Sequence, residues 1–253
     1  MKPIDLNCDL GEGVVDPSIE TALLDSVTSA NIACGGHAGD VSTIRRLALA
    51  CAARGTGIGA HPSYPDRKGF GRESLALTAA EIEKSVLSQL QVFASVVEGV
   101  PGARIAHIKP HGALYHDAMQ NLDIADAIAR AARGVAPAAV LVGQAGLRGL
   151  ERWKESGFRV AREAFADRKY EPDGTLRSRK LPGALLQSPS EAAAQAVMIA
   201  REGRAFASDG SSVWIDAETI CLHSDTPGAV DFAAAVRRAL MSASVQVCRM
   251  GAA

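Results

Sequence analysis

The chain has 253 residues, of which 47% are hydrophobic and 22% are charged, and its formal net charge is −1. This composition supports a sizeable core and excludes wholesale disorder, and the length suits one large domain. The near-neutral charge and the lack of a long basic run argue against nucleic acid as a partner.

The cellular compartment can also be predicted. The N-terminal stretch MKPIDLNCDL lacks the basic-then-apolar order of a signal peptide, and the sequence has no apolar run long enough to predict a membrane span. The five cysteines are odd in number and show no paired metal-binding spacing, which fits a reducing compartment better than a disulfide framework. We therefore expect a cytoplasmic protein that makes no membrane contact.

Short β-rich runs alternate along the chain with longer helical ones. Strands are predicted near residues 4–9, 29–35, 57–62, 104–110, 139–143, 159–166 and 219–224. Helices are predicted over 41–54, over a long segment that begins LTAAEIEKSVLSQLQVF, and over 122–133, 146–156, 190–202 and 228–242. In the long segment, Thr78 and Glu81 have the spacing of a capping box, with Thr78 as the N-cap.

This alternation predicts parallel strands joined by crossover helices. About seven strands in this length favour an α/β fold of one domain, a (β/α) barrel over residues 1–253. An open, doubly wound sheet remains the alternative. The polar, turn-rich stretch 168–189 is predicted to be an extended loop over a site, because core-like segments flank it on both sides.

Polar and ionisable residues stand at the ends of most predicted strands. They are Asn7 and Asp9, then His37 and Asp40, His61, the trio His107, Lys109 and His111, Asp167 with Arg168, and finally His223 with Asp225. Side chains alternate faces along a strand with a period of two, so several of these share a face. In barrels and open α/β sheets alike, sites form at the carboxyl ends of strands, so these side chains should converge.

The segment ANIACGGHAGD, residues 30–40, illustrates how such a strand end is built. Gly35 and Gly36 allow a sharp turn after the strand and a close approach to a ligand, so that His37 can face the mouth of the fold. Asp40 is better explained as the N-cap of the following helix than as a catalyst.

Other residues have structural interpretations of their own. His107 lies deeper in its strand and is explained as well by structure as by function, and His116 is expected to be solvated. Cys8 and Cys34 are interpreted as small core residues. Cys221 lies on the same side of its strand as the nearby histidine, so a place in the site stays open although the core is favoured.

Known motifs narrow the chemistry only slightly. The chain has neither a GxxxxGK[ST] phosphate loop nor a GxSxG elbow, and no GxGxxG follows a strand. A divalent metal held by Asp9, His61 and His111 is chemically possible, but no spacing demands it. The residues alone therefore predict a hydrolase-like barrel that acts on a small polar molecule.

Six blocks carry a more specific signal: LNCDLGEG (6–13), ANIACGGHAGD (30–40), GAHPSYPDRKGFGR (59–72), KPHGALYH (109–116), EAFADRKY (163–170) and ICLHSDTPGA (220–229). Together and in this order they resemble the LamB/YcsF family over nearly the whole chain. One departure is Val14-Val15, where the family more often has an aromatic residue and a glycine. The resemblance implies a barrel similar to those of glycoside hydrolases and polysaccharide deacetylases.

The resemblance also implies an activity. The characterised members of the family are A subunits of an ATP-dependent 5-oxoprolinase, which hydrolyses 5-oxo-L-proline (pyroglutamate) to L-glutamate together with subunits B and C. The substrate is an unactivated cyclic amide, so coupling to ATP makes chemical sense. Because this chain has no phosphate loop, ATP is expected to be bound on the partner subunits. A homo-oligomer is compatible with the sequence.

This hypothesis gives roles to the residues in the matching blocks. The residues expected to take part in catalysis are Asp9, Glu12, His37, His61, Lys109 and His111. Those expected to bind the substrate are Asn7, Tyr64, Arg72, Tyr115, Asp167, Arg168, His223 and Asp225. A carboxylate or a histidine would activate water, Lys109 would stabilise the oxyanion, and an arginine would pair with the substrate carboxylate.

Two other interpretations stay open. A stand-alone, metal-dependent deacetylase or amidohydrolase would bind a divalent ion and lose activity with a chelator. A non-catalytic subunit that holds a small anion would tolerate replacement of both Lys109 and His111. The number of titratable groups aimed at one place favours an enzyme, since an anion site needs mainly hydrogen-bond donors.

Overall fold

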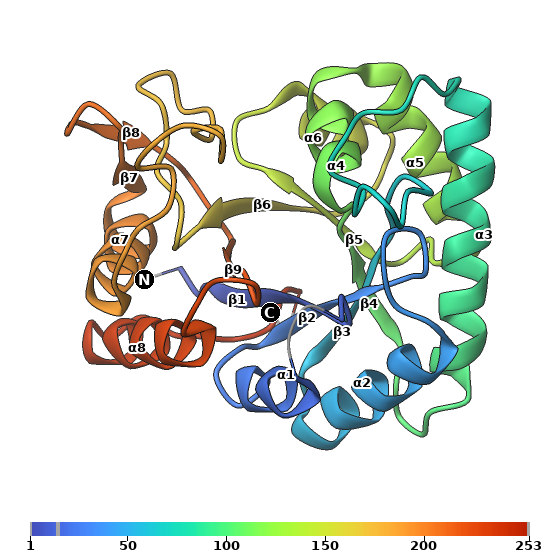
Figure 1. Ribbon diagram of the computed structural model, residues 1–253, viewed down its shortest axis with the longest axis horizontal. Helices are drawn as coiled ribbons and strands as arrows, with labels where there is room; N and C mark the ends of the chain where they lie inside the picture. Colours follow the sequence, from blue (N-terminus) through green and yellow to red (C-terminus); the bar gives the residue numbers. More distant parts are fainter. Residues whose placement is uncertain (1, 14–15, 252–253) are drawn as a thin grey trace.

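The computed structural model describes residues 2–13 and 16–251; Val14 and Val15, where the sequence departs from the family pattern, lie outside these ranges. Within them, seven parallel strands close into a barrel (Figure 1). In barrel order they are β1 (Asp5–Leu10), β2 (Ser29–Ala33), β3 (Gly57–His61), β4 (Ile105–Ile108), β5 (Val140–Gln144), β6 (Val160–Phe165) and β9 (Thr219–Leu222). The predicted barrel is confirmed, and the open sheet is wrong because β9 pairs with both β6 and β1.

The strands alternate between an apolar outer face and a polar barrel interior. In β1, Leu6 and Cys8 belong to the hydrophobic core, as predicted for Cys8. Asn7 lies between them in sequence and points the other way, and its Nδ2 donates to Glu163 Oε1 of β6 at 3.0 Å. A strand with a period of two can thus supply both the core and a hydrogen-bonded interior.

Eight helices of the described residues surround the barrel (Figure 1). They are α1 (Pro17–Leu23), α2 (Val41–Arg54), α3 (Ala79–Glu98), α4 (Gly112–Gln120), α5 (Leu122–Val135), α6 (Arg148–Glu155), α7 (Pro189–Glu202) and α8 (Ala229–Ser242). Helix α3 packs against α5, and α7 packs against α8. None of the described helices combines the length and the hydropathy needed to cross a bilayer.

Two predicted helix starts are confirmed by their hydrogen bonds. The Asp40 carboxylate caps α2 by accepting from the backbone N–H of Thr43 at 2.8 Å. Thr78 and Glu81 form the reciprocal capping box at the start of α3. Each cap satisfies backbone donors that the first turn of a helix leaves without partners.

Three features have no counterpart among the predicted elements. They are α1, α4, and an antiparallel hairpin of β7 (Arg204–Phe206) with β8 (Ser212–Trp214). Helix α4 begins directly after the fourth strand's KPH segment and has no side-chain cap, so it lacks the usual start signal. The hairpin strands have three residues each, which is too short for a periodic pattern.

Candidate active site

A cavity of about 540 Å³ lies at the carboxyl ends of the strands. Asp9, His61, Lys109, Phe165 and His223 reach it from five different strands or the residues that directly follow them. Part of its wall comes from Leu176, Ser178, Arg179 and Lys180, so the long loop 168–189 extends over this cavity. The site therefore occupies the end of the barrel where the sequence predicted that polar side chains would converge.

Lys109 is the electrostatic centre of the barrel interior. Its Nζ lies 3.0 Å from Asp9 Oδ1, 2.9 Å from Glu163 Oε1 and 3.1 Å from Cys221 Sγ. Burial lowers the pKa of Lys109, but the nearby Asp9 carboxylate, Cys221 and Glu163 outweigh burial, and the net pKa lies well above its usual value. Burial likewise raises the pKa of Asp9, but Lys109 and His61 hold it well below the usual range. Lys109 and Asp9 are therefore a charged pair.

Three imidazoles and a carboxylate form a cluster beside this pair. His61 Nε2 lies 3.0 Å from His111 Nδ1, and Glu12 Oε1 lies 3.0 Å from the same His111 nitrogen. His37 stacks on His111 with ring centroids 3.6 Å apart, and its Nε2 lies 3.1 Å from Glu12 Oε1. Burial raises the pKa of Glu12, but its contacts with His111 and His37 bring it below its usual range. Glu12 is thus a carboxylate held in place by its neighbours.

A histidine–carboxylate dyad faces the cluster across the cavity. His223 Nδ1 lies 3.0 Å from Asp167 Oδ1 and 2.9 Å from Oδ2, and the Thr226 hydroxyl donates to Asp167 Oδ2 at 3.1 Å. Burial raises the pKa of Asp167, but His223 outweighs burial and holds it below the usual value. The carboxylate accepts a hydrogen bond from the Nδ1–H group of His223. Nε2 of the same ring can therefore interact with a ligand in the cavity.

Cationic groups line the outer part of the cavity. Arg72 Nη2 and Arg179 Nη1 both bind Asp225 Oδ2, at 2.7 and 3.1 Å. Arg168 is only 5% exposed, and its Nη2 donates to the Arg177 carbonyl oxygen at 2.6 Å. Within residues 2–13 and 16–251, no carboxylate forms an ion pair with Arg168, and its Nε is buried without a partner. Arg168 is therefore a buried charge that an anionic ligand could satisfy.

Most of the predicted site residues do meet at this cavity. Those that line it are Asp9, Glu12, His61, Arg72, Lys109, His111, Tyr115, Arg168, His223 and Asp225. Four lie behind its wall: Asn7 and Asp167, which hold other site residues, His37, which holds Glu12, and Tyr64. Tyr64, predicted to bind the substrate, is instead buried away from the cavity, and its hydroxyl donates to Asp117 Oδ2 at 2.8 Å.

The structure shows the surroundings of the two remaining histidines and of two cysteines. His107 is fully buried, with Nε2 2.7 Å from Asn31 Oδ1, in a structural position below the cavity. His116 is exposed, as predicted, on the rim of the cavity. Cys34 and Cys221 both belong to the hydrophobic core, as favoured, but Cys221 Sγ also contacts Lys109. Cys221 is therefore both a core residue and a neighbour of a site residue, which are the two possibilities that the sequence left open.

The sequence interpretation assigned no site role to Glu163, Phe165 or Asn31. Glu163 is the second carboxylate that forms an ion pair with Lys109. Asn31 Nδ2 donates to Asp9 Oδ1 at 2.8 Å. Phe165 forms part of the cavity wall and stacks on His223. Strand parity was the available signal for Glu163, which shares a face with Asp167.

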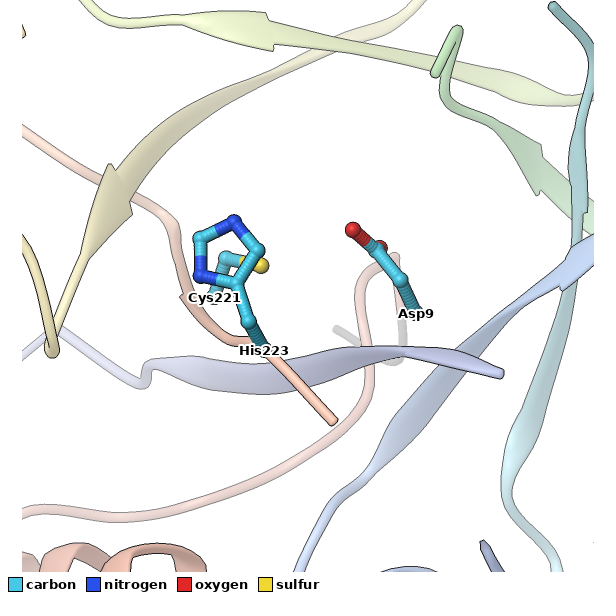
Figure 2. A group of neighbouring side chains, drawn as sticks. All are labelled: Asp9, Cys221 and His223. Atoms are coloured by element: carbon cyan, nitrogen blue, oxygen red, sulfur yellow. The ribbon is translucent and has the colours of Figure 1, made fainter. Parts of the chain in front are cut away.

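Two groups of side chains have donor atoms close enough to hold a metal ion: Asp9, Cys221 and His223, and Glu12, His61 and His111. Figure 2 shows the first group, in which Asp9 from β1 and His223 after β9 project toward the same space. All of these residues except Cys221 line the cavity, and in the first group the Lys109 ammonium already contacts Asp9 and Cys221.

A parallel barrel with carboxylates, imidazoles and a lysine at the carboxyl ends of its strands belongs to the class that hydrolyses small polar substrates. The chain itself belongs to the LamB/YcsF family, whose profile matches residues 4–253. Two similar curated proteins are each named as the A subunit of 5-oxoprolinase. The one from Tolumonas auensis is 44% identical over 99% of this chain and 100% of its own length. The one from Chloroflexus aurantiacus is 46% identical over 98% of each.

Solved structures agree with the fold. The lactam utilization protein from Thermus thermophilus has a TM-score of 0.89 and 38% identity, over 98% of this chain and 99% of that one. A family 4 carbohydrate esterase from Streptomyces lividans has a TM-score of 0.52 and 13% identity, over 98% of this chain and 91% of that one. The second similarity concerns the barrel fold alone.

Proposed function

We propose that this chain is the A subunit of an ATP-dependent 5-oxoprolinase and that its cavity opens the lactam ring of 5-oxo-L-proline to give L-glutamate. One observation carries the proposal: a single cavity joins a buried ammonium, carboxylates and imidazoles to a buried arginine that has no described ion-pair partner. The names of the full-length relatives, and that of the lactam utilization protein, support the same substrate class.

Arg168 is the residue best suited to bind the substrate carboxylate. A buried guanidinium without a described counter-ion gains most from a bidentate contact with an anion. Arg72 is less suitable because Asp225 already pairs with it and nearly half of its side chain is exposed. With the carboxylate at Arg168, the ring would lie toward Lys109, which lines the same cavity.

Lys109 would stabilise the negative charge that develops on oxygen at the reacting carbonyl carbon as water adds to it. The general base would be Asp9, His61 or His111, all of which lie at the cavity next to Lys109. The ring nitrogen needs a proton as the C–N bond breaks. His223, held through Nδ1 by Asp167, would deliver that proton from Nε2.

We assign the use of ATP to subunits B and C. Phosphorylation of the amide oxygen would make the lactam carbon more electrophilic. Water would add to that carbon, the C–N bond would break to leave an acyl phosphate, and hydrolysis of the acyl phosphate would release glutamate and phosphate. The chain has no phosphate loop, so the activated substrate would reach this cavity from the partners. Such an ATP-coupled complex would work in the cytoplasm.

The experiment is to measure glutamate formed from 5-oxoproline by the purified chain, alone and then with subunits B and C, with and without ATP. We expect turnover only when all three subunits and ATP are present. ATP-independent turnover by the chain alone would instead identify a stand-alone amidohydrolase. Full activity of a complex that carries Lys109→Met and His111→Ala together would show that this chain only binds.

A further inference from the structure

Three acceptor atoms converge in the wall of the cavity, and a carboxylate oxygen of Asp9 lies beside one of them. His61 Nε2 lies 3.0 Å from His111 Nδ1, 3.9 Å from Glu12 Oε1 and 3.5 Å from Asp9 Oδ2. Glu12 Oε1 also lies 3.0 Å from His111 Nδ1. All four residues are at most 8% exposed, so bulk water does not separate these atoms.

Hydrogen bonds on the far side of the two rings show where their protons lie. His61 Nδ1 is 2.7 Å from the carbonyl oxygen of Lys109, and His111 Nε2 is 3.0 Å from the carbonyl oxygen of Phe70. A carbonyl oxygen can only accept, so each of these nitrogens carries the N–H of its ring. In neutral rings, the two nitrogens that face each other are therefore both lone pairs. Two such lone pairs beside two carboxylate oxygens repel one another unless a cation lies among them.

We propose that Glu12, His61 and His111 hold a divalent metal ion of the zinc type and leave a fourth position open to the cavity. Metal–ligand bonds of about 2.0–2.1 Å in a tetrahedral site place neighbouring ligand atoms about 3.3 Å apart. The three separations among the ligand atoms of Glu12, His61 and His111, 3.0 to 3.9 Å, bracket that value. Ligating histidines almost always donate their other N–H to a carbonyl or carboxylate, as His61 and His111 do here.

His37 supports the same assignment. Its Nε2 lies 3.1 Å from Glu12 Oε1, and its ring stacks on His111 with an interplanar angle of 4°. A hydrogen bond of this kind orients a ligating carboxylate, and the stacking fixes the plane of the neighbouring imidazole. All three ligands are thus held in position from outside the metal site.

The other group of donors, Asp9, Cys221 and His223, does not need an ion. The Lys109 ammonium already lies 3.0 Å from Asp9 Oδ1 and 3.1 Å from Cys221 Sγ, which belong to the side chains of two of the three residues in this group. That fixed positive charge balances the carboxylate and repels a second cation. The two oxygens of Asp9 have different neighbours: Oδ1 lies 3.0 Å from Lys109 Nζ, and Oδ2 lies 3.5 Å from His61 Nε2.

A bound ion would supply a Lewis acid in the wall of the cavity. The metal site and the proposed function are tested separately, because metal binding is measured without substrate, ATP or partner subunits. Failure of metal binding would leave the oxoprolinase proposal with Asp9 or a histidine as base. Failure of turnover would leave the metal site unaffected.

The test is a titration of the chelator-treated chain with Zn²⁺ by calorimetry and with Co²⁺ by visible absorption. We expect one ion per chain and the intense visible bands of tetrahedral cobalt. Glu12→Gln, which has nearly the same shape, should weaken binding by more than the roughly 100-fold upper range for changes outside the ligand set. Cys221→Ser is the matched control and should bind like the unchanged chain.

Three results would overturn the site. The first is no binding by the folded, unchanged chain, which would mean that a proton shared by His61 and His111 occupies the gap. The second is binding that Glu12→Gln does not weaken. The third is a thiolate-to-cobalt charge-transfer band that disappears in Cys221→Ser, which would put the ion in the other donor group. Circular dichroism of each variant checks that it is folded.

Discussion

Lys109 Nζ lies 3.0 Å from Asp9 Oδ1, and this ion pair spans the barrel interior from the end of β4 to β1. Both groups are buried, and each stabilises the charged form of the other. The pair thus keeps a full positive charge where a developing oxyanion would need it.

Lys109→Met tests that role. The substitution removes the oxyanion donor, so we expect glutamate formation by the complex to fall by about 10²–10³-fold. It also leaves Asp9 and Glu163 as buried charges without the ammonium, which should lower the free energy of unfolding by about 3–5 kcal/mol. Steady-state turnover and urea unfolding measure the two effects.

A second substitution separates these effects. Adding Glu163→Gln to Lys109→Met removes one of the stranded charges, so part of the lost stability should return while turnover stays low. Near-normal turnover of the single variant would remove Lys109 from the mechanism.

Arg168→Met should raise the KM for 5-oxoproline by about 10–100-fold, because charged hydrogen bonds contribute about 1.5–3 kcal/mol. Arg72→Met is the matched control. Arg72 is paired with Asp225 and half exposed, so its loss should change KM much less. Equal effects of the two substitutions would contradict the assignment of Arg168 to the substrate carboxylate.

Acid should destabilise the protein through its buried histidines. Burial lowers the pKa of His107 to about 3 and that of His37 to about 4, whereas an unfolded histidine titrates near about 6.5. The unfolded chain therefore binds more protons below pH ~6.5, and the free energy of unfolding falls as the pH decreases from there toward ~4.

Asp5 acts in the opposite direction, because burial raises its pKa to about 6 and protonation then favours the folded state. A comparison with His107→Gln isolates the histidine effect, since Asp5 is the same in both proteins. Urea unfolding at several pH values between about 7 and 5 should show a shallower acid dependence in His107→Gln. Parallel curves would show that His107 does not contribute.

Gly59 is needed for a close approach inside the barrel. A Cβ at this position of β3 would lie 1.9 Å from His107 Nε2. Gly59→Ala should therefore lower the free energy of unfolding by about 1–3 kcal/mol, as overpacking does. Gly134→Ala is the control: in α5 its Cβ meets only Leu87 Cδ1, at 3.4 Å, and better helix propensity should leave stability equal or higher by up to ~1 kcal/mol. Equal losses in thermal or urea unfolding would contradict the packing argument.

The barrel could be predicted from the sequence because each strand is a short run between turn residues or polar ends. Strand parity also identified the side of each strand that carries the site. Parity cannot identify partners across the barrel: Asn7 and Glu163 are 156 residues apart and meet only because the sheet closes. The contact of Cys221 with Lys109 could not be predicted for the same reason, since it also depends on closure.

Tyr64 illustrates a second limit. Helix α4 has no start signal in the sequence, and Asp117 of that helix is the residue that accepts from the Tyr64 hydroxyl. Without the helix, the tyrosine had no visible partner and was assigned to the substrate. Because α4 was not predicted, Tyr64 was given a functional role although its role is structural.

Ring opening in this cavity can be tested by following a single turnover of 5-oxoproline and ATP to glutamate in the reconstituted three-subunit complex. With Lys109→Met and His111→Ala in this chain, we predict that ATP is still bound by the complex and no glutamate appears. Glutamate formed at the unchanged rate would show that the ring is opened elsewhere.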